Sequence, residues 1–222
     1  QPDTDNKISV IVRSYKRPWN VRTMIEVLGD KSKYPSIDEI IVSHGEPSTF
    51  TEFKGVTNVK RFEENKIYGG TQAFWTALGA KHRFILFVDD DQIPDPKLVK
   101  TLTERIARDP ISIYGPHQRL CTKKGYSHGS QQYNVILTST LMTSKEVIRS
   151  YLDNFERYES VLRKNHGNAE DLSLNHHLLS HYNKEPVRVP GGHTVLDENT
   201  GSYRGKSTHY TQRDAFCKAF FI

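Results

Sequence analysis

Residues 84–91 read Phe-Ile-Leu-Phe-Val-Asp-Asp-Asp. A short, β-prone apolar run of this kind is typical of a strand that is buried on both faces. Three carboxylates follow it directly, and because adjacent carboxylates repel one another, we expect a compensating cation nearby. Oxygen ligands of this kind suit a hard divalent ion such as Mg²⁺ or Mn²⁺. The alternative is a polar turn, in which residues 91–96 cap the next helix.

Outward from this strand, the chain alternates between short β-prone runs and segments with apolar residues at helical spacing. The first half predicts strands at 8–13, 39–43, 58–62 and 83–88, and helices at 18–28, 71–78 and 96–107. The second half predicts strands at 111–114 and 133–138, and helices at 144–151, at 153–164 and from residue 172 onward. Strand–helix alternation favours a parallel sheet with right-handed crossovers in the first half, so we expect an α/β fold.

No linker or internal repeat divides the 222 residues. A chain of this length fits one large domain, and we expect a single domain with two lobes, residues 1–115 and 116–222. Polar segments at 13–17, 43–45 and 89–91 follow predicted strands of the first lobe. Because ligands bind beyond the carboxyl ends of parallel strands, we expect these segments to converge on one cleft.

The composition restricts the partners of the chain. It has 31 Lys and Arg against 26 Asp and Glu, and the basic residues are dispersed rather than clustered. We therefore expect no nucleic-acid partner, whereas a modest basic excess suits a small anionic substrate. No apolar run approaches the length of a membrane span. Two cysteines and the absence of an Asn-x-Ser/Thr site favour a reducing compartment.

A second acidic pair, Glu170-Asp171, follows a Gly-Asn turn at the start of a predicted helix. Two interpretations stay open. Capping and the helix dipole favour acids in a first helical turn. A carboxylate here could also act as a catalytic base, or stabilise a positive centre that develops on a sugar.

The C-terminal stretch carries Lys206, His209 and Arg213 at roughly helical spacing. A cation from this set could reach a diphosphate and stabilise a leaving nucleotide. The alternative is a solvated tail.

Other polar and aromatic residues have simpler interpretations. His177 and His181 lie four residues apart, but the His-Glu-x-x-His arrangement is missing, so we interpret them as surface histidines. Trp19 and Trp75 lie on predicted helices, and we expect both in the core.

Four segments taken in order resemble one family: residues 8–15 with Arg17, residues 84–91, residues 168–175, and the tail with His209 and Arg213. They resemble glycosyltransferases of the GT-A fold, most closely the exostosin-like enzymes of family 64. Residues 88–91 are similar to the Asp-x-Asp segment of that family, and residues 126–137 to its acceptor-side strand. Residues 168–175 resemble its Asn-Cys-Asp-Asp-Ile-Ala-Met-Asn stretch, and the similarity covers nearly the whole chain.

The resemblance implies a GT-A nucleotide-diphospho-sugar transferase fold, Rossmann-like, with a mixed central sheet flanked by helices. Residues 1–115 would bind the nucleotide sugar and residues 116–222 the acceptor. The implied donor-binding residues are Arg17, His44, Asn65, Asp89, Asp90 and Arg213. The implied ligands of Mn²⁺ or Mg²⁺ are Asp91 and Asp89, and the implied catalytic residues are Asp171, Glu170 and Arg213.

The chain departs from the family pattern at two places. Gly69-Gly70 stand where the family has an Arg after the third strand. Ala169 stands where it has a Cys, so we expect Cys217 to lack its disulfide partner. Unpaired cysteines favour a cytoplasmic enzyme; the alternative is a trimmed luminal domain of the Golgi or endoplasmic reticulum.

Together these features predict a metal-dependent transfer of sugar from a UDP-sugar to a glycan or glycoconjugate hydroxyl, with retention of anomeric configuration. One alternative is an inverting transferase with Asp171 as base. Others are a nucleotidyltransferase and a non-catalytic nucleotide-sugar-binding module.

Overall fold

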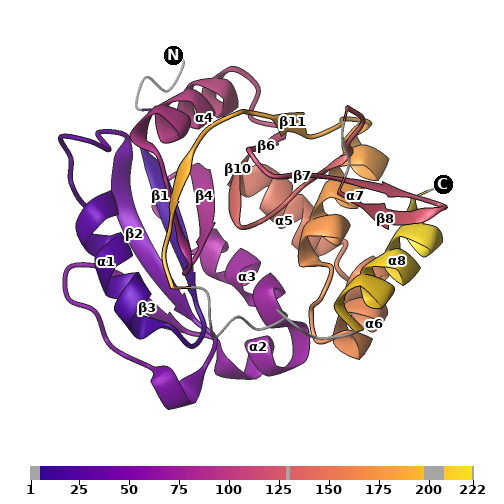
Figure 1. Ribbon diagram of the computed structural model, residues 1–222, viewed down its shortest axis with the longest axis horizontal. Helices are drawn as coiled ribbons and strands as arrows, with labels where there is room; N and C mark the ends of the chain where they lie inside the picture. The colour runs from indigo at the N-terminus through magenta and orange to yellow at the C-terminus, as the bar shows by residue number, and fades with distance from the viewer. Residues whose placement is uncertain (1–5, 129–130, 198–207, 222) are drawn as a thin grey trace.

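The computed structural model describes residues 6–128, 131–197 and 208–221. Its centre is a seven-stranded sheet in the order β11-β6-β10-β4-β1-β2-β3 (Figure 1). Four neighbouring strands are parallel: β1 (Ile8–Ser14), β2 (Ile37–His44), β3 (Thr57–Lys60) and β4 (Phe84–Asp89). The mixed half adds β6 (Ile113–Gly115), β10 (Thr140–Ser144) and β11 (Val187–Arg188), with β10 antiparallel to β4. The predicted α/β class with a mixed central sheet is confirmed.

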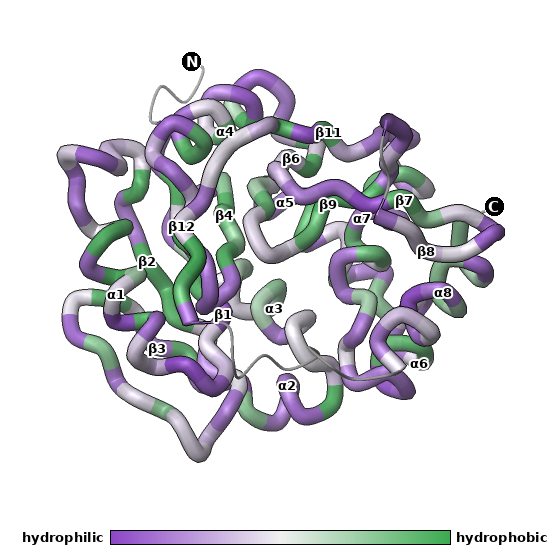
Figure 2. Tube along the Cα trace, in the orientation of Figure 1, coloured by the Kyte–Doolittle hydropathy of each residue, from purple (hydrophilic) through white to green (hydrophobic). Residues whose placement is uncertain are grey.

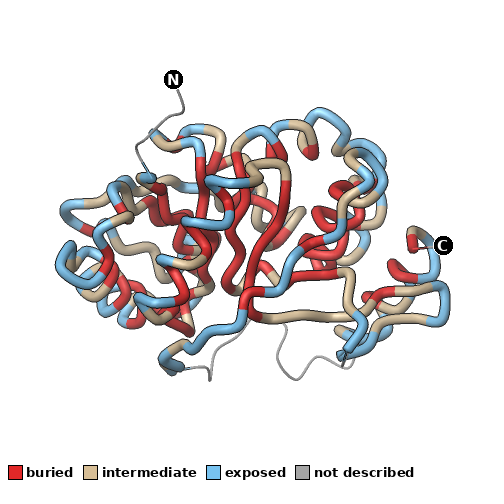
Figure 3. The backbone as a smooth tube through the Cα atoms, turned by 90° about the horizontal axis from the view of Figure 1, so that it is seen from above, coloured by how far each residue is buried: buried red, intermediate tan, exposed pale blue. Residues whose placement is uncertain are grey.

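Helices cover both faces of this sheet because its strands are apolar on both sides. In β1, Val10 and Val12 pack with α1 (Pro18–Leu28) and α4 (Pro96–Arg108), whereas Ile11 packs with α3 (Gln72–Leu78) and α5 (Lys145–Asp153). Figures 2 and 3 show the same arrangement as apolar, buried strands between more polar outer helices. The strand predicted at 83–88 is therefore the buried centre of the molecule.

The remaining described elements lie outside the seven-stranded sheet. The helical ones are η1 (Pro47–Thr49), α2 (Phe62–Tyr68), η2 (Gly69–Thr71), α6 (Glu156–Lys164), α7 (Glu170–Tyr182) and α8 (Thr208–Phe220). A three-stranded sheet contains β7 (Gln118–Thr122), β8 (Gly125–Ser127) and β9 (Val135–Ile136), and a two-stranded sheet pairs β5 (Gln92–Pro94) with β12 (His193–Val195). The division into lobes at residues 115 and 116 stays a prediction.

Several elements differ from the sequence prediction. The third strand ends at Lys60, and Phe62 already opens α2. The polar stretch between the strands predicted at 111–114 and 133–138 folds into β7 and β8, and β10 was not predicted. Trp19 is 49% exposed at the start of α1, so the prediction of a core position is wrong. Its side chain lies in the first turn of an amphipathic helix, ahead of the buried face formed by Val21 and Met24.

Cys121 and Cys217 form a disulfide that joins β7 to α8 across 96 residues of sequence. The expectation that Cys217 lacks a partner is therefore wrong. The fold places α8 against β7, so a cysteine on that strand takes the role that Ala169 cannot fill. Both cysteines are fully buried in the apolar core.

His177 is also placed differently from the prediction, because it is 2% exposed rather than on the surface. Its Nε2 lies 2.9 Å from Ser150 Oγ, and the neighbouring His176 Nδ1 lies 2.9 Å from Tyr158 Oη. Burial lowers the pKa of both imidazoles to about 4, with further repulsion from Arg157 and, for His177, first from His181. His181 is exposed, as expected.

We expect these buried histidines to make folding sensitive to mild acid. Between about pH 6.5 and pH 4 the unfolded chain binds a proton at each site and the folded chain does not, so stability falls as the pH decreases. Each site contributes at most about 1.4 kcal/mol per pH unit. Urea unfolding at several pH values should give a flatter pH dependence for His177→Gln than for the wild type. An unchanged slope in His177→Gln would refute the expectation.

Candidate active site

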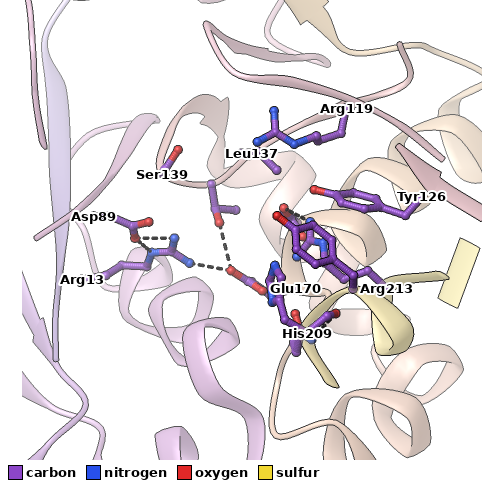
Figure 4. A pocket seen from close by; sticks show the side chains of 13 residues that line it. Arg13, Asp89, Arg119, Tyr126, Leu137, Ser139, Glu170, His209 and Arg213 are labelled. Carbon is purple, nitrogen blue, oxygen red and sulfur yellow. Dashed lines mark hydrogen bonds and ion pairs between the residues drawn. The ribbon is translucent and has the colours of Figure 1, made fainter. Parts of the chain in front are cut away.

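A cavity of about 190 Å³ opens where the carboxyl ends of β1 and β4 face α7 and α8 (Figure 4). Arg13 and Asp89 line it from the central sheet, and Glu170 and Asp171 from the start of α7. The other lining residues are Arg119, Tyr126, Leu137, Thr138, Ser139, Asn168, His209, Tyr210 and Arg213. Residues from both halves of the sequence therefore meet in one pocket. Of the three polar segments expected to converge, 13–17 contributes Arg13 and 89–91 contributes Asp89, whereas 43–45 contributes none of the lining residues.

Arg13 connects the two acidic groups across this cavity. Its Nε donates to Asp89 Oδ1 at 2.7 Å, its Nη2 contacts the same oxygen, and its Nη1 donates to Glu170 Oε1 at 2.9 Å. Thr138 Oγ1 also donates to Glu170 Oε1, at 3.1 Å. We call Arg13 with Asp89 and Glu170 the Arg13 bridge.

Burial and charge act in opposite directions on the two acids of the bridge. Burial raises the pKa of Asp89 above its usual range; Arg13 opposes this, but repulsion from Asp91 and Asp90 adds to it. Burial would also raise the pKa of Glu170, yet Arg13 and then Arg213 outweigh it and hold that pKa below its usual range. Glu170 is therefore a buried carboxylate that stays ionised.

Arg17 neutralises the other two acids of the triplet. Its Nε donates to Asp90 Oδ1 at 2.9 Å and its Nη1 to Asp91 Oδ2 at 3.0 Å. The backbone N–H of Tyr15 completes the binding of Asp90, at 2.8 Å to Oδ2. The chain just after β12 is bound to the same acidic segment, because Leu196 N donates to Asp91 O at 2.7 Å. Arg17, at 6% exposure, is thus a structural partner of the acids here.

Asp171 and Arg213 form a buried ion pair on the other wall. Arg213 Nη2 donates to Asp171 Oδ2 at 2.5 Å, and Leu172 N donates to Oδ1 at 2.8 Å. The guanidinium lies over the ring of Tyr126, 4.5 Å from its centroid. These contacts fix the orientation of both side chains.

Within the described residues, three buried side-chain atoms of the cavity lining have no hydrogen-bond partner: Arg119 Nε, Asn168 Oδ1 and Arg213 Nε. Asn168 is 1% exposed and Arg213 4% exposed. Because a buried polar atom without a partner costs about 1–3 kcal/mol, such atoms mark a place where a polar ligand group is expected. Asn168 precedes Glu170 and Asp171 in the chain, and Arg213 pairs with Asp171.

The backbone that precedes Glu170 and Asp171 packs closely against the backbone at Tyr68. Gly167 has φ 78°, and a Cβ at this position would collide with the carbonyl oxygen of Tyr68. Ala169, fully buried, has φ 129°, which L-residues rarely adopt. Such strain concentrates at functional sites, and here it aims Glu170 and Asp171 from the first turn of α7 into the cavity.

His44 and Asn65 lie outside the cavity. His44 is 1% exposed; its Nε2 is 3.0 Å from Asn58 Oδ1, and its ring stacks on Phe53. Asn65 packs against Gly45, at the end of β2. Both remain at the carboxyl ends of β2 and β3, and their donor-binding roles stay predictions. Lys206 lies outside the described residues.

The acidic triplet suits a metal ion whose ligands come partly from the protein and partly from a substrate. In the described part of the chain, no group of three or more His, Cys, Asp or Glu could hold a metal ion by itself. Arg13 uses Oδ1 of Asp89 and Arg17 uses Oδ2 of Asp91, so the second oxygen of each carboxylate is not engaged by these arginines. Mg²⁺ and similar ions are commonly bound by one or two carboxylates together with substrate phosphates. The residues therefore fit such an ion.

Residues 8–221 match the family model described as the glycosyl transferase family 64 domain. This chain belongs to glycosyltransferase family 64. The resemblance inferred from the sequence is confirmed, and the protein is a glycosyltransferase, with a fold consistent with a single-domain enzyme of this kind. No curated protein matches the chain. None of the described helices of this family 64 glycosyltransferase has the length and apolar character of a membrane span.

Sequence reasoning missed several cavity residues of this family 64 glycosyltransferase. Arg13 was noted only as part of the first polar segment, because its partner Glu170 lies 157 positions away. Arg119, Tyr126 and Tyr210 enter the cavity from β7, β8 and α8. The exposure of Tyr210, 56%, is unusual for a large aromatic residue but is visible only in the folded chain.

Proposed function

We propose that this enzyme transfers a sugar from a UDP-sugar to a hydroxyl of a glycan or glycoconjugate, with a divalent metal ion and with retention of anomeric configuration. One observation supports the proposal: Asp89, the first acid of the triplet at the end of β4, lines the same cavity as the ion-paired Glu170, Asp171 and Arg213. A donor must present its diphosphate and its anomeric carbon to one site, and this cavity joins groups suited to each.

The proposed donor roles follow from the charges. Asp91 and Asp89 would ligate Mn²⁺ or Mg²⁺, and the ion would screen the diphosphate and stabilise the charge of the departing UDP. Arg213 would bind the diphosphate from the other wall through its unpartnered Nε. Asp90, His44, Asn65 and Arg17 would shape the nucleoside and ribose side.

The proposed sugar roles fall to the start of α7. Glu170, held ionised by Arg13 and Arg213, would accept hydrogen bonds from sugar hydroxyls. Asp171 would stabilise positive charge that develops at the anomeric centre.

The hydrogen bonds of Asp171 favour retention over inversion. An inverting transferase needs a carboxylate that removes the proton of the acceptor. Both oxygens of Asp171 already accept hydrogen bonds, one from Arg213 and one from Leu172 N. A carboxylate whose two oxygens already accept hydrogen bonds is poorly placed to take the proton of an acceptor hydroxyl, which supports same-face attack assisted by the departing phosphate. NMR of the product determines the anomeric configuration.

Aromatic side chains favour binding of the acceptor at the wall of the cavity that contains Tyr126 and Tyr210. Tyr210 is 56% exposed at the cavity, and its ring centroid lies 6.3 Å from that of Tyr126 and 6.3 Å from that of His128. Exposed aromatic rings offer an apolar face to a sugar ring. Arg119 and His209 lie in the same wall and would bind its polar groups.

The compartment also stays a proposal. The cytoplasmic expectation depended in part on unpaired cysteines, and the disulfide removes that support. An oxidising compartment, the alternative, suits a disulfide.

Calorimetry with UDP tests the donor site directly. We expect UDP to bind in the presence of Mn²⁺ and at least about tenfold more weakly without it, because the metal screens the acids from the diphosphate. Asp91→Ala should remove this metal dependence. Asp109→Ala, whose carboxylate pairs with Lys184 outside the cavity, is the matched control and should bind as the wild type does. Equal UDP affinity with and without Mn²⁺, or in Asp91→Ala, contradicts the proposal.

A further inference from the structure

Arg13 is the group that joins the two ends of the proposed donor site. Asp89, which with Asp91 is a proposed metal ligand, lies at the end of β4, whereas Glu170 begins α7 at the proposed sugar end. Both acids are bound by one guanidinium whose side chain is 11% exposed. No other described side chain has ion pairs with acids of both segments.

Gly70 leaves room for the guanidinium of Arg13 because it has no side chain. A Cβ on Gly70 would lie 2.7 Å from Arg13 Nη1 and 3.1 Å from Glu170 Oε1. Such a contact is closer than van der Waals packing allows, and the guanidinium cannot move away without breaking its bonds to Asp89 or Glu170. Gly70 and Arg13 therefore fit one another, which gives a physical reason for the small residue at this place.

The geometry of arginine suits a bridge better than other cations. A guanidinium is planar and presents several N–H donors in a fixed fork, so it binds two carboxylates in defined directions. Without it, Asp89 and Glu170 would face one another as buried like charges and would repel. Lys could supply the charge but only as a flexible point donor.

We propose that Arg13 is a positioning residue for sugar transfer, which fixes Asp89 and Glu170 at one separation so that the diphosphate and the sugar of a bound donor are aligned together. This inference rests on the proposed function. It requires that loss of the bridge lowers the rate of transfer more than it lowers the affinity for the nucleotide, because UDP itself reaches only one end of the bridge.

Three substitutions test separately the charge of Arg13, the geometry of its N–H donors, and the space beside Gly70 that its guanidinium occupies. Arg13→Gln removes the charge, Arg13→Lys keeps the charge without the fork, and Gly70→Ala displaces the guanidinium without changing any charge. Gly79→Ala is the matched control for the glycine, since its Cβ would have no heavy atom closer than 3.6 Å. Arg83→Gln controls for loss of an arginine, since it breaks an exposed ion pair with Glu146.

The measurements are UDP binding with Mn²⁺ by calorimetry, thermal unfolding, and hydrolysis of UDP-glucose, UDP-galactose, UDP-N-acetylglucosamine, UDP-N-acetylgalactosamine, UDP-glucuronate and UDP-xylose. With the donor that the wild type hydrolyses, we expect kcat to fall about 100-fold in Arg13→Gln and about tenfold in both Arg13→Lys and Gly70→Ala. UDP affinity should stay within about threefold, and the controls should match the wild type.

Two results would overturn the inference. One is kcat within about threefold of the wild type in both Arg13→Gln and Gly70→Ala. The other is a parallel loss of kcat and of UDP affinity, which shows a general disturbance of the site. Absence of turnover by the wild type with every donor, combined with absence of UDP binding, would instead contradict the proposed function, so the two failures are distinguishable.

Discussion

Asp171→Asn should lower the rate of sugar transfer by about 10³-fold while the protein stays folded and binds UDP with Mn²⁺ within a few-fold of the wild type. The carboxylate is 3% exposed and pairs with Arg213 at the wall of the cavity. In such a site a fixed negative charge stabilises a developing positive centre strongly, because little water screens it. The amide has nearly the same shape and keeps the hydrogen bond from Leu172 N, so the loss reports the charge.

The prediction is checked by initial rates with a donor that the wild type uses, and by calorimetry. Asp109→Asn provides the control, since it weakens an ion pair of similar length, 2.7 Å, between half-exposed side chains outside the cavity. A rate for Asp171→Asn within tenfold of the wild type would contradict a role at the reacting centre. Unfolding of this variant would be seen in its thermal transition, and Asp171→Glu would then test the same charge in a displaced position.

Loss of the Cys121–Cys217 disulfide should lower the free energy of unfolding by about 2–4 kcal/mol. The bond closes a loop of 96 residues, and reduction returns conformational entropy to the unfolded chain. For a protein of this size, the melting temperature should fall by roughly 2–4 °C per kcal/mol. Activity should become more sensitive to heat, because α8 carries Arg213 and Tyr210 into the cavity.

Urea unfolding of the oxidised and fully reduced wild type measures this difference without any mutation. Cys121→Ala/Cys217→Ala should unfold near the reduced protein and show no response to reductant. Thiol titration in denaturant gives an independent check: the oxidised protein should release thiols only after reduction. Two reactive thiols in the untreated protein would show that the bond does not form.

The first half of the fold was predictable because the structure that its local sequence favours is the structure that its tertiary contacts require. The strands at 8–13, 39–43 and 83–88 are mainly apolar and contain β-branched side chains, and such segments are favoured at the centre of a parallel sheet. Pro18 and Pro96 stand at the first positions of α1 and α4, where proline needs no hydrogen-bond partner.

The second half was less predictable because tertiary contacts override its local patterns. Residues 140–144 contain three hydroxyl side chains, yet they form β10 inside the sheet, between β6 and β4, and Thr143 Oγ1 donates to the carbonyl of Ser112 at 2.8 Å. This contact comes from a residue 31 positions away, so no local pattern predicts it.

The same reasoning separates the predicted from the missed parts of the site. Asp89–Asp91 and Glu170-Asp171 were visible because clustered acids are costly and need partners. Their arginine partners were not assignable, since Arg13 reaches Asp89 and Glu170 across 76 and 157 positions. The disulfide was missed for the same reason: the resemblance pointed to position 169, whereas the fold brings Cys121 to Cys217.

Arg13 and Arg17 are both committed to acids before any ligand arrives. A diphosphate brings several negative charges toward residues 89–91, so its approach is opposed unless a metal ion arrives with it. Ligands that each relieve the repulsion felt by the other bind cooperatively, and thermodynamic linkage makes the enhancement equal in both directions. We therefore expect the coupling free energy between metal and donor to determine when the enzyme is loaded, so that a fall in either concentration empties both positions together.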